Sequence, residues 1–304
     1  MMIFTKILAL CVLQSLPAVT TAFSVNSASL PKQTSRHTVA LRSTSGATDV
    51  PVFPVGLPMQ RVQGGGTIRT YQIPGWADRV QMEIRTNGRP MRCKIQLWLG
   101  PLRNVHIMDI DTQDGQLSPY RAGLKFPADG QGRVLSIQTS ESLEMPVDVA
   151  VTVPSVERSA EIAAAFDQVW STSDKIKVQG AVVGSGEAGS VRTFPIDSDV
   201  DAVQFMCWSR DTGKKGLKAK IELLQGPNNK RQVYDLLCKG STQPFHAVFE
   251  TPGAGWIIRL VNKKNIEDGL FQAVVLPYKL GSAATQVGQL PSGNPASAAK
   301  EWWQ

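Results

Sequence analysis

Short segments of the chain alternate apolar and polar residues with a period of two. Val80, Met82 and Ile84 are apolar and the residues between them are polar, and residues 93–99 and 148–153 follow the same pattern. Because neighbouring side chains of a strand point to opposite faces of a sheet, this pattern predicts half-buried β-strands. Their regular spacing, with Gly and Pro between them, predicts a mostly β fold of antiparallel sheets, arranged as a sandwich or a half-barrel.

Asn87-Gly88 lies between the first two predicted strands. Both residue types tolerate the positive φ that the tight turn of a β-hairpin requires. The sequence therefore predicts a hairpin that joins residues 80–85 to residues 93–99.

The same series of residues occurs twice along the chain. Residues 66–71 (GTIRTY) return as residues 189–194 (GSVRTF), 123 positions later. Residues 95–101 (IQLWLGP) return as residues 221–227 (IELLQGP), 126 positions later. The shift from 123 to 126 fits a longer turn in the second unit, so the two copies stay in register apart from one small insertion.

The repeat continues to the end of each unit. Residues 149–154 align with residues 272–277, again at an offset of 123. Agreement over such a length is typical of internal duplication. It predicts two homologous sandwich-like domains, at residues 61–154 and 178–280.

The connector between the two units, residues 155–177, is expected to contain a short helix at residues 157–170. Alanine, the strongest helix former, is frequent there. Ile162, Phe166 and Val169 fall on one face at helical spacing. We expect a linker helix that packs on a sheet, and a helix at an interface is the alternative.

The first part of the chain has the composition of a targeting sequence. Residues 1–22 combine Lys6, a short apolar run and small residues, as in a signal peptide. Residues 23–47 are rich in Ser and Thr, carry basic residues and lack acids, as in a transit peptide. This two-part leader resembles the plastid-targeting sequences of algae with secondary plastids, and the junction at Ala22-Phe23 resembles the cleavage site of diatom plastid precursors. It implies the plastid stroma; plain secretion is the competing interpretation.

Composition and charge exclude several classes of protein. The chain has 304 residues, of which 42% are hydrophobic and 19% charged, as expected for a globular protein. Its net charge of +7 falls to +3 without the four basic residues of the leader, so we expect no nucleic-acid partner. The body has no apolar run long enough for a membrane span, so we expect no membrane partner.

The sequence offers few groups for chemistry. With Cys11 lost in the leader, three cysteines remain, and we expect Cys93, Cys207 and Cys238 to be buried reduced thiols. The stretch from Asp109 to Gly115 departs from the spacing of a calcium loop and indicates a strand end and a turn. We therefore predict no cofactor, no metal and no enzyme activity. An enzyme would have to use the only plausible candidates: Asp109, Asp235, His106 and His246.

Large apolar groups and matched charges are the candidate association sites. Trp98 and Leu224 occupy equivalent positions opposite the apolar faces of their strands, and Trp208 does the same on another strand. Apolar groups on both faces of a strand indicate a second packed layer or an exposed association surface. Arg69 and Arg192 are also equivalent. The candidate interface thus consists of Trp98, Leu224, Trp208, Arg69, Arg192 and the tail residues below.

The tail, residues 281–304, is small and polar until it ends in Trp302-Trp303. Such a segment buries too little apolar area to order itself, whereas each Trp gains from burial. We expect a flexible tail with a docking motif, on the same molecule or a neighbour. A tail that folds back on its own domain is the alternative.

A chain with this leader, two similar β-rich domains and an aromatic end resembles the PyShell family, the pyrenoid shell proteins of diatoms and related algae. The segments that carry the resemblance are residues 66–71 and 95–101, their second copies and Trp302-Trp303. The resemblance implies a structural protein that assembles with itself into a lattice around the Rubisco matrix at the pyrenoid periphery. Paralogous shell proteins and the Rubisco matrix are its further implied partners, and its implied role is to support CO₂ concentration and carbon fixation. A non-enzymatic β-sandwich module that binds carbohydrate or a plastid protein is the alternative function.

Overall fold

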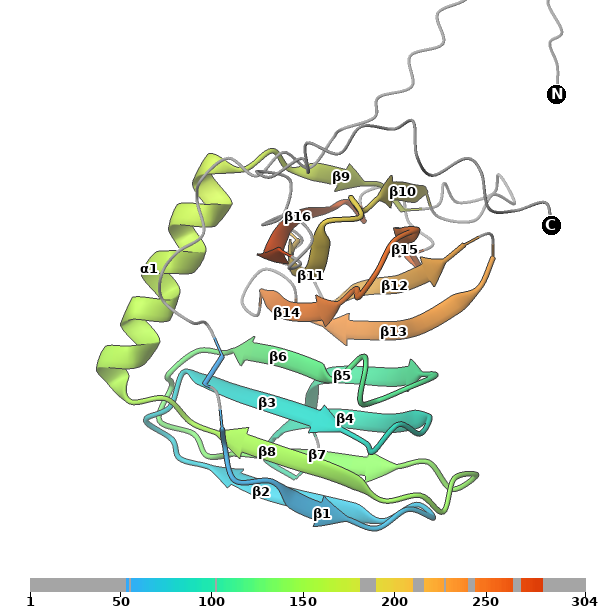
Figure 1. Cartoon of the computed structure of the whole chain (residues 1–304). Coiled ribbons are helices and arrows are strands. Elements are labelled where there is room, and N and C mark those ends of the chain that lie inside the picture. Colours follow the sequence, from blue (N-terminus) through green and yellow to red (C-terminus); the bar gives the residue numbers. More distant parts are fainter. Residues whose placement is uncertain are drawn as a thin grey trace, which may run out of the picture. The chain divides into compact units, whose positions relative to one another are not determined.

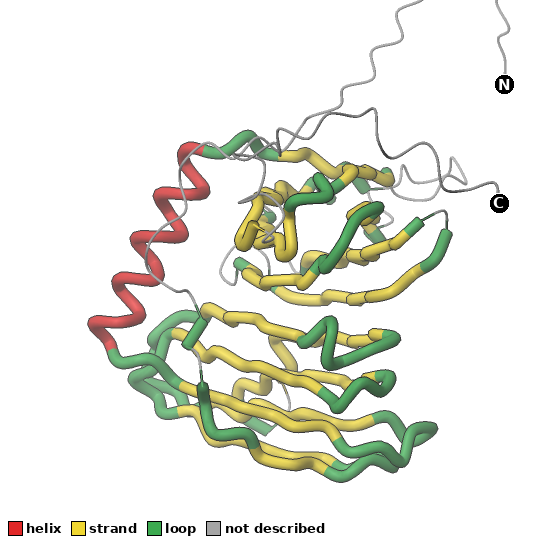
Figure 2. The backbone as a smooth tube through the Cα atoms, in the orientation of Figure 1, coloured by secondary structure: helices red, strands yellow, loops and turns green. Residues whose placement is uncertain are grey.

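The computed structural model describes residues 53–54, 56–101, 103–180, 190–209, 216–226, 228–239, 244–264 and 269–280. All of them belong to one compact unit of the chain. Within these ranges the chain forms sixteen β-strands and one α-helix (Figures 1 and 2). The predicted leader, residues 1–47, and the predicted tail, residues 281–304, lie outside the described residues.

Each repeat contributes eight strands in the same order. The first repeat contains β1 (Gln60–Val62), β2 (Ile68–Ile73), β3 (Arg79–Arg85), β4 (Met91–Leu99), β5 (Arg103–Thr112), β6 (Tyr120–Lys125), β7 (Arg133–Thr139) and β8 (Val147–Thr152). The second contains β9 (Ile176–Val178), β10 (Val191–Pro195), β11 (Val200–Trp208), β12 (Leu217–Gln225), β13 (Lys230–Cys238), β14 (Phe245–Glu250), β15 (Trp256–Asn262) and β16 (Phe271–Leu280).

The strands form two antiparallel sheets of eight strands. Sheet A has the order β1-β8-β3-β6-β14-β11-β16-β9, and sheet B has the order β10-β15-β12-β13-β5-β4-β7-β2. Each repeat thus gives four strands to each sheet, in the strand order of a jelly roll. The mostly β, sandwich-like and internally duplicated fold predicted from the sequence is confirmed.

The two repeats are joined strand to strand in both sheets. In sheet B, β5 pairs antiparallel with β13, and Asp109 lies opposite its own repeat equivalent, Asp235. In sheet A, β6 pairs with β14, and Ala122 lies opposite its equivalent, Ala247. A local twofold axis therefore passes between the repeats, and both sheets continue across it (Figure 1).

The main core lies between the two sheets and contains side chains of both repeats. Val80, Met82 and Ile84 of β3 are at most 1% exposed, as the period-two pattern predicted. On β4, Cys93, Ile95 and Leu97 point inward as well. The polar positions between these residues of β4 lie on the outer face of sheet B.

The hairpin predicted at Asn87-Gly88 is wrong. Here β3 belongs to sheet A and β4 to sheet B, so the turn carries the chain across the sandwich. Gly88 does take a positive φ of 68°, and Thr86 Oγ1 donates to the Arg89 carbonyl oxygen at 2.6 Å. A turn dipeptide indicates only that the chain reverses its direction. It can occur whether the next strand pairs with the first strand or belongs to the opposite sheet.

The predicted alignment of residues 149–154 with residues 272–277 is also wrong by one residue. Val149 pairs with Ile84, and Ala273 pairs with Cys207, the equivalent of Ile84. The structural offset is therefore 124 rather than 123. Because a shift of one residue exchanges the two faces of a strand, the sequence alignment matched buried Val149 with an outward-facing glutamine.

Helix α1 (Val156–Thr172) connects the repeats and covers the outer face of sheet A (Figure 1). Ser155 caps its first turn, because its side chain accepts a hydrogen bond from Arg158 N at 3.2 Å. Ile162 packs against Phe53 and two residues of sheet A, and Val169 packs against Met206 and Val274. The predicted linker helix packed on a sheet is confirmed. No helix in the described ranges is long and apolar enough to cross a membrane.

Candidate functional site

The outer face of sheet B is the main open face of the described part of the chain. Helix α1 covers sheet A, and the described residues contain no second helix that would cover sheet B. Most outward side chains of the central strands are polar or charged, and Ile107, Val233 and Leu237 are half-buried apolar residues among them. A polar majority is typical of the solvent-facing side of an antiparallel sheet.

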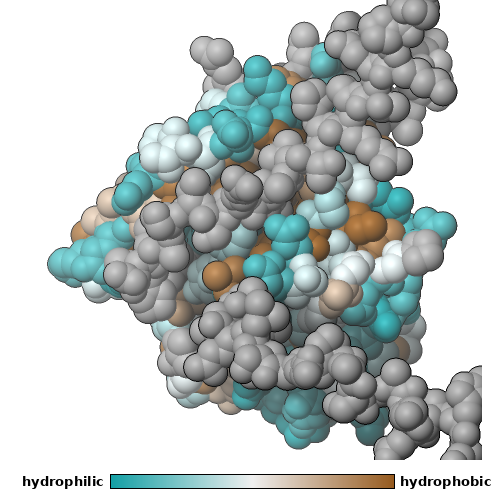
Figure 3. All heavy atoms as spheres, turned by 45° about the horizontal axis from the view of Figure 1, so that its top comes forward, coloured by the Kyte–Doolittle hydropathy of each residue, from teal (hydrophilic) through white to brown (hydrophobic). Residues whose placement is uncertain are grey.

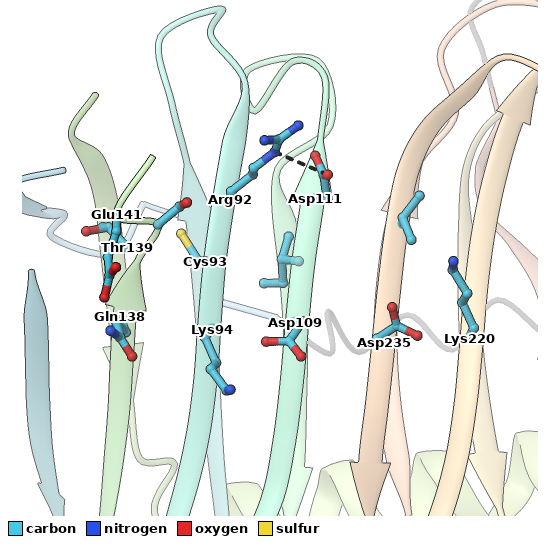
Figure 4. Close-up of a pocket in the computed structure, with 13 residues that line it drawn as sticks. Arg92, Cys93, Lys94, Asp109, Asp111, Gln138, Thr139, Glu141, Lys220 and Asp235 are labelled. Carbon is cyan, nitrogen blue, oxygen red and sulfur yellow. Dashed lines mark ion pairs between the residues drawn. The ribbon is translucent and has the colours of Figure 1, made fainter. Parts of the chain in front are cut away.

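A row of four charges crosses the centre of this face. Lys94, Asp109, Asp235 and Lys220 lie side by side on β4, β5, β13 and β12 (Figure 4). The two lysines are repeat equivalents, and so are the two aspartates. The row therefore has the sign order plus, minus, minus, plus about the local twofold axis.

One ion pair lies beside the row, and a second includes one of its aspartates. Arg92 Nε lies 3.2 Å from Asp111 Oδ2, and Lys263 Nζ lies 2.5 Å from Asp235 Oδ1. Among the described residues, Asp109 forms no ion pair. Its charge is opposed by Asp235 on one side and balanced by Lys94 on the other, because these residues lie directly across from it on the neighbouring strands.

The row forms the floor of an open depression of about 630 Å³. Its rim includes Gln138, Ser140 and Glu141 from β7 and the turn that follows. The depression is open, and polar and charged residues make up most of its lining, unlike the mostly apolar pockets that hold small molecules. It is suited to contact with another charged surface.

A second group of charges lies beside the depression. Glu222, whose side chain is 4% exposed, pairs with Lys220 at 3.4 Å, with Lys230 at 2.9 Å and with Arg259. Burial acts to raise the pKa of Glu222, but the hydrogen bonds from Lys230 and Arg259 outweigh it, so its pKa lies below the ordinary value. This carboxylate thus stays charged and holds three strands together.

Cys93, Cys207 and Cys238 are buried thiols, as predicted. Burial raises the pKa of the Cys93 and Cys238 thiols to about 12 and also raises the pKa of Cys207. Because the thiolate is the nucleophile, these neutral thiols are poorly reactive.

The four residues considered for catalysis do not converge on one site. Asp109 and Asp235 lie outside sheet B. His106 lies inside the sandwich with its ring 6.0 Å from that of Phe245, and His246 lies outside sheet A among Phe53, Phe166 and α1. Burial lowers the pKa of each histidine to about 3, so both are neutral.

The predicted interface residues fall on different surfaces. Trp98 and Leu224 lie on the outer face of sheet B, where Trp98 is half-buried and Leu224 is 4% exposed. Trp208 is half-buried on the outer face of sheet A. Arg69 and Arg192 are exposed on β2 and β10, the two edge strands of sheet B. Trp302 and Trp303 lie outside the described residues.

Sequence reasoning missed the charged row, although a signal for it existed. At the offset of 126, Lys94 aligns with Lys220 just as Asp109 aligns with Asp235. Only the pairing of β5 with β13 brings these four residues together. That pairing joins residues far apart in the sequence and leaves no local pattern.

These features define the class of protein. It is an internally duplicated β-sandwich whose distinctive parts are surfaces, namely one wide charged face and two edge strands, rather than an enclosed pocket. The family model described as "Diatom pyrenoid shell protein" matches residues 54–277, nearly the whole described region. The chain belongs to this family.

Other comparisons add little. No curated protein sequence matches the chain. Matches among solved structures include the stem and receptor binding domain of the spike protein P1 from bacteriophage PM2, with 11% identity, 70% of this chain and 98% of that chain covered, and a TM-score of 0.19. A structure of infectious bursal disease virus, Gt strain, has 11% identity, 79% and 82% coverage, and a TM-score of 0.10. At these TM-scores neither likeness carries an argument.

Proposed function

We propose that the protein assembles with itself into a lattice that surrounds the Rubisco-containing pyrenoid inside the plastid. Such a shell would keep the Rubisco matrix in shape and restrict the loss of CO₂, and so support carbon fixation. The observation that carries the proposal is the match to the pyrenoid shell family over residues 54–277. In this role the protein catalyses no reaction and needs no cofactor or metal.

The duplication supports assembly on physical grounds. Two repeats related by a local twofold axis give one chain two similar sets of contact surfaces. Contacts that use two different surfaces and do not close into a ring generate filaments, tubes or sheets. Trp98 on one sheet and Trp208 on the other are the half-buried apolar side chains that we assign to such contacts, whereas Leu224, which is 4% exposed, has little surface to contribute. Arg69 and Arg192 are the charged ones.

We also assign a docking role to Trp302 and Trp303. Each aromatic side chain that leaves water buries about 150–250 Å², and a tether of about twenty residues lets the pair reach another subunit. Removal of residues 281–304 should then abolish ordered assembly and leave a folded protein. A truncated protein that forms the same sheets as the full chain would exclude this role.

The partners and location follow from the same proposal. The first partner is a second copy of the chain, and paralogous shell proteins and the Rubisco matrix are further partners. Residues 1–47 would direct the chain to the plastid. Fusion of these residues to a fluorescent protein should place the fluorescence in the plastid; fluorescence in the secretory pathway or outside the cell would contradict this assignment.

The experiment that tests the proposal is negative-stain electron microscopy of purified residues 48–304 across a concentration series. We expect regular sheets or tubes above a threshold concentration. Dispersed single particles at every concentration would overturn self-assembly, and would favour a monomeric binding module for carbohydrate or a plastid protein.

A further inference from the structure

The two sheets differ at their edges. Sheet A ends in β1 and β9, which have three residues each and carry a charged residue at the centre, Arg61 and Lys177. Sheet B ends in β2, with six residues, and β10, with five. Natural sheets protect their edges by short strands and by charge. The edge strands of sheet B are longer, although Arg69, Arg192 and Pro195 give them part of this protection.

The edge strands of sheet B present free hydrogen-bonding groups. The Thr67 carbonyl accepts from Thr139 N at 3.0 Å, toward β7. Because successive residues of a strand direct their N–H and C=O groups to alternate sides, Ile68, Thr70 and Gln72 direct theirs away from the sheet. Among the described residues, no strand pairs with this side of β2.

The same alternation applies to β10. The Ser190 carbonyl accepts from Asn262 N at 3.2 Å, and Ile196 N donates to the Trp256 carbonyl at 2.9 Å, both toward β15. Val191, Thr193 and Pro195 therefore direct their backbone groups outward, although Pro195 has no N–H to donate. In the described chain β10 is the last strand of the sheet on this side.

The two edges are also equivalent and opposite in direction. Sheet B is antiparallel throughout, so its first strand, β10, and its eighth, β2, run in opposite directions. If β10 of a second copy lies beside β2, the antiparallel alternation continues without interruption. The local twofold axis thus makes each end of the sheet the complement of the other end.

We propose that β2 of one molecule pairs antiparallel with β10 of a second copy, with Thr70 opposite Thr193 of that copy. In this register each threonine donates its outward N–H and accepts with its outward C=O. The proposal rests on the proposed function, since it names the contact through which the shell subunits would join. It makes sheet B continuous from one subunit to the next.

The side chains fit this register. Arg69 comes opposite Phe194 of the second copy, and Tyr71 comes opposite its Arg192, so each arginine faces an aromatic ring across the new pair. Arginine beside an aromatic face is an attractive contact. Arg69 and Arg192, which are exposed at equivalent positions of the two edges, thus each gain an aromatic partner from the second copy.

The contact also removes exposed apolar surface. Ile68 is 58% exposed and Val191 is 49% exposed, and both project from the outer face of sheet B at its edges. In the view from the side of β9 and β10, hydrophobic side chains lie between hydrophilic ones on the surface (Figure 3). A strand added at either edge would cover part of these side chains.

The experiment blocks one edge at a time. Proline at position 70 or 193 removes an outward N–H and leaves the bonds to β7 or β15 in place, because proline is tolerated on edge strands. We expect Thr70→Pro and Thr193→Pro each to raise the concentration at which assembly begins by at least about tenfold. Thr70→Val and Thr193→Val keep the N–H and should assemble as the unchanged protein does.

Mixing the two proline variants identifies the partners. The Thr70→Pro protein offers only β10, and the Thr193→Pro protein offers only β2. Below the concentration at which either variant assembles, each should therefore remain a monomer alone, whereas an equimolar mixture should form a one-to-one dimer, measured by light scattering after size exclusion. Dimers of either variant alone would overturn the β2–β10 pairing in favour of pairing between like edges.

Lysine variants test whether the proline variants fail to assemble because the edge contact is lost or because the protein misfolds. Ile68→Lys and Val191→Lys change exposed positions and place a charge on the edge, so they should block assembly without a change in melting temperature. If all four blocking variants assemble like the unchanged protein, the edge contact is wrong while the shell function stands. If the unchanged protein assembles at no concentration, the shell function and the edge contact both fail.

Discussion

Asp109 on β5 and Asp235 on β13 lie directly opposite each other on the outer face of sheet B, where the two repeats meet. Each is the repeat equivalent of the other, so the local twofold axis passes between two like charges. Like charges that face each other across paired strands destabilise a sheet. Lys263 pairs with Asp235 and offsets part of this repulsion, and Lys94 and Lys220 lie across from the two aspartates on the neighbouring strands.

The first prediction concerns these lysines. The double substitution Lys94→Met and Lys220→Met removes the cations across from the two aspartates, leaves Lys263 paired with Asp235 and also removes the contact of Lys220 with Glu222. We expect the free energy of unfolding to fall by about 0.5–1 kcal/mol at low salt. Added salt should restore part of the loss, because it screens exposed charges. Urea unfolding at two salt concentrations measures both effects.

Lys218→Met is the matched control, since Lys218 is exposed on the same strand but lies opposite Leu237. It should leave the stability unchanged. Adding Asp109→Asn to the double variant should recover part of the lost stability, because it removes one of the two like charges. If Asp109→Asn lowers the free energy of unfolding further, the two aspartates do not repel each other in the folded protein.

The second prediction concerns the pH dependence of stability. Burial holds the pKa of His106 and His246 at about 3 in the folded protein, below the usual value near 6.5 in the unfolded chain. Between these values the unfolded state binds more protons, so stability is full above pH 6.5 and falls as the pH is lowered. Each histidine should contribute a slope of about 1.4 kcal/mol per pH unit.

His246→Phe tests this prediction, because the ring of His246 packs against Phe53 and Phe166 and lies near the charge of Arg79. The variant should lose about half of the slope between pH 6 and pH 5, measured by urea unfolding at each pH. An unchanged slope would mean that His246 takes up its proton equally in both states.

The third prediction concerns the attachment of α1 to β3. Ser159 is buried, donates from Oγ to Asp78 Oδ1 at 2.5 Å and accepts from Arg79 Nε at 3.4 Å. Ser159→Ala removes both contacts and should lower the free energy of unfolding by about 1–2 kcal/mol. Ser171→Ala, at an exposed position near the end of the same helix, should change it little. Equal effects of the two substitutions would show that the buried bonds contribute nothing specific.

The fourth prediction concerns Glu222, which holds Lys220, Lys230 and Arg259 together. Glu222→Gln removes the charge from this group and should cost about 2 kcal/mol of stability at pH 7. Because the pKa of Glu222 is lowered in the folded state, its stabilisation is present above pH 4.5 and is lost as the pH falls through the folded value. The difference in free energy of unfolding between the unchanged protein and Glu222→Gln should therefore decrease as the pH is lowered.

Glu161→Gln provides the comparison, since Glu161 is 59% exposed and pairs with Arg158 at the surface of α1. This substitution should lower the free energy of unfolding by less than about 0.5 kcal/mol. If the stability difference between Glu222→Gln and the unchanged protein instead increases in acid, Glu222 is not a carboxylate that the fold stabilises in its charged form.

The sequence by itself determined the duplication, the β-strands, the helix between the repeats and the burial of the cysteines. These depend on local spacing: the period of two in residues 80–84, the helical spacing of Ile162 and Phe166, and the return of whole segments 123 to 126 positions later. Each of these patterns can be recognised within one short segment or by aligning two segments. The resemblance to pyrenoid shell proteins rested on the same repeated segments.

Only the tertiary structure decided how the strands are distributed between the sheets. Asn87-Gly88 marks a reversal, but pairing over long distances determines that the chain there crosses from sheet A to sheet B. The same pairing places Asp109 against Asp235 and leaves β2 and β10 at the two ends of sheet B. Such contacts join residues of separate segments, as Arg79 with Lys125 and Asp109 with Asp235, so no local pattern of apolar and polar residues encodes them.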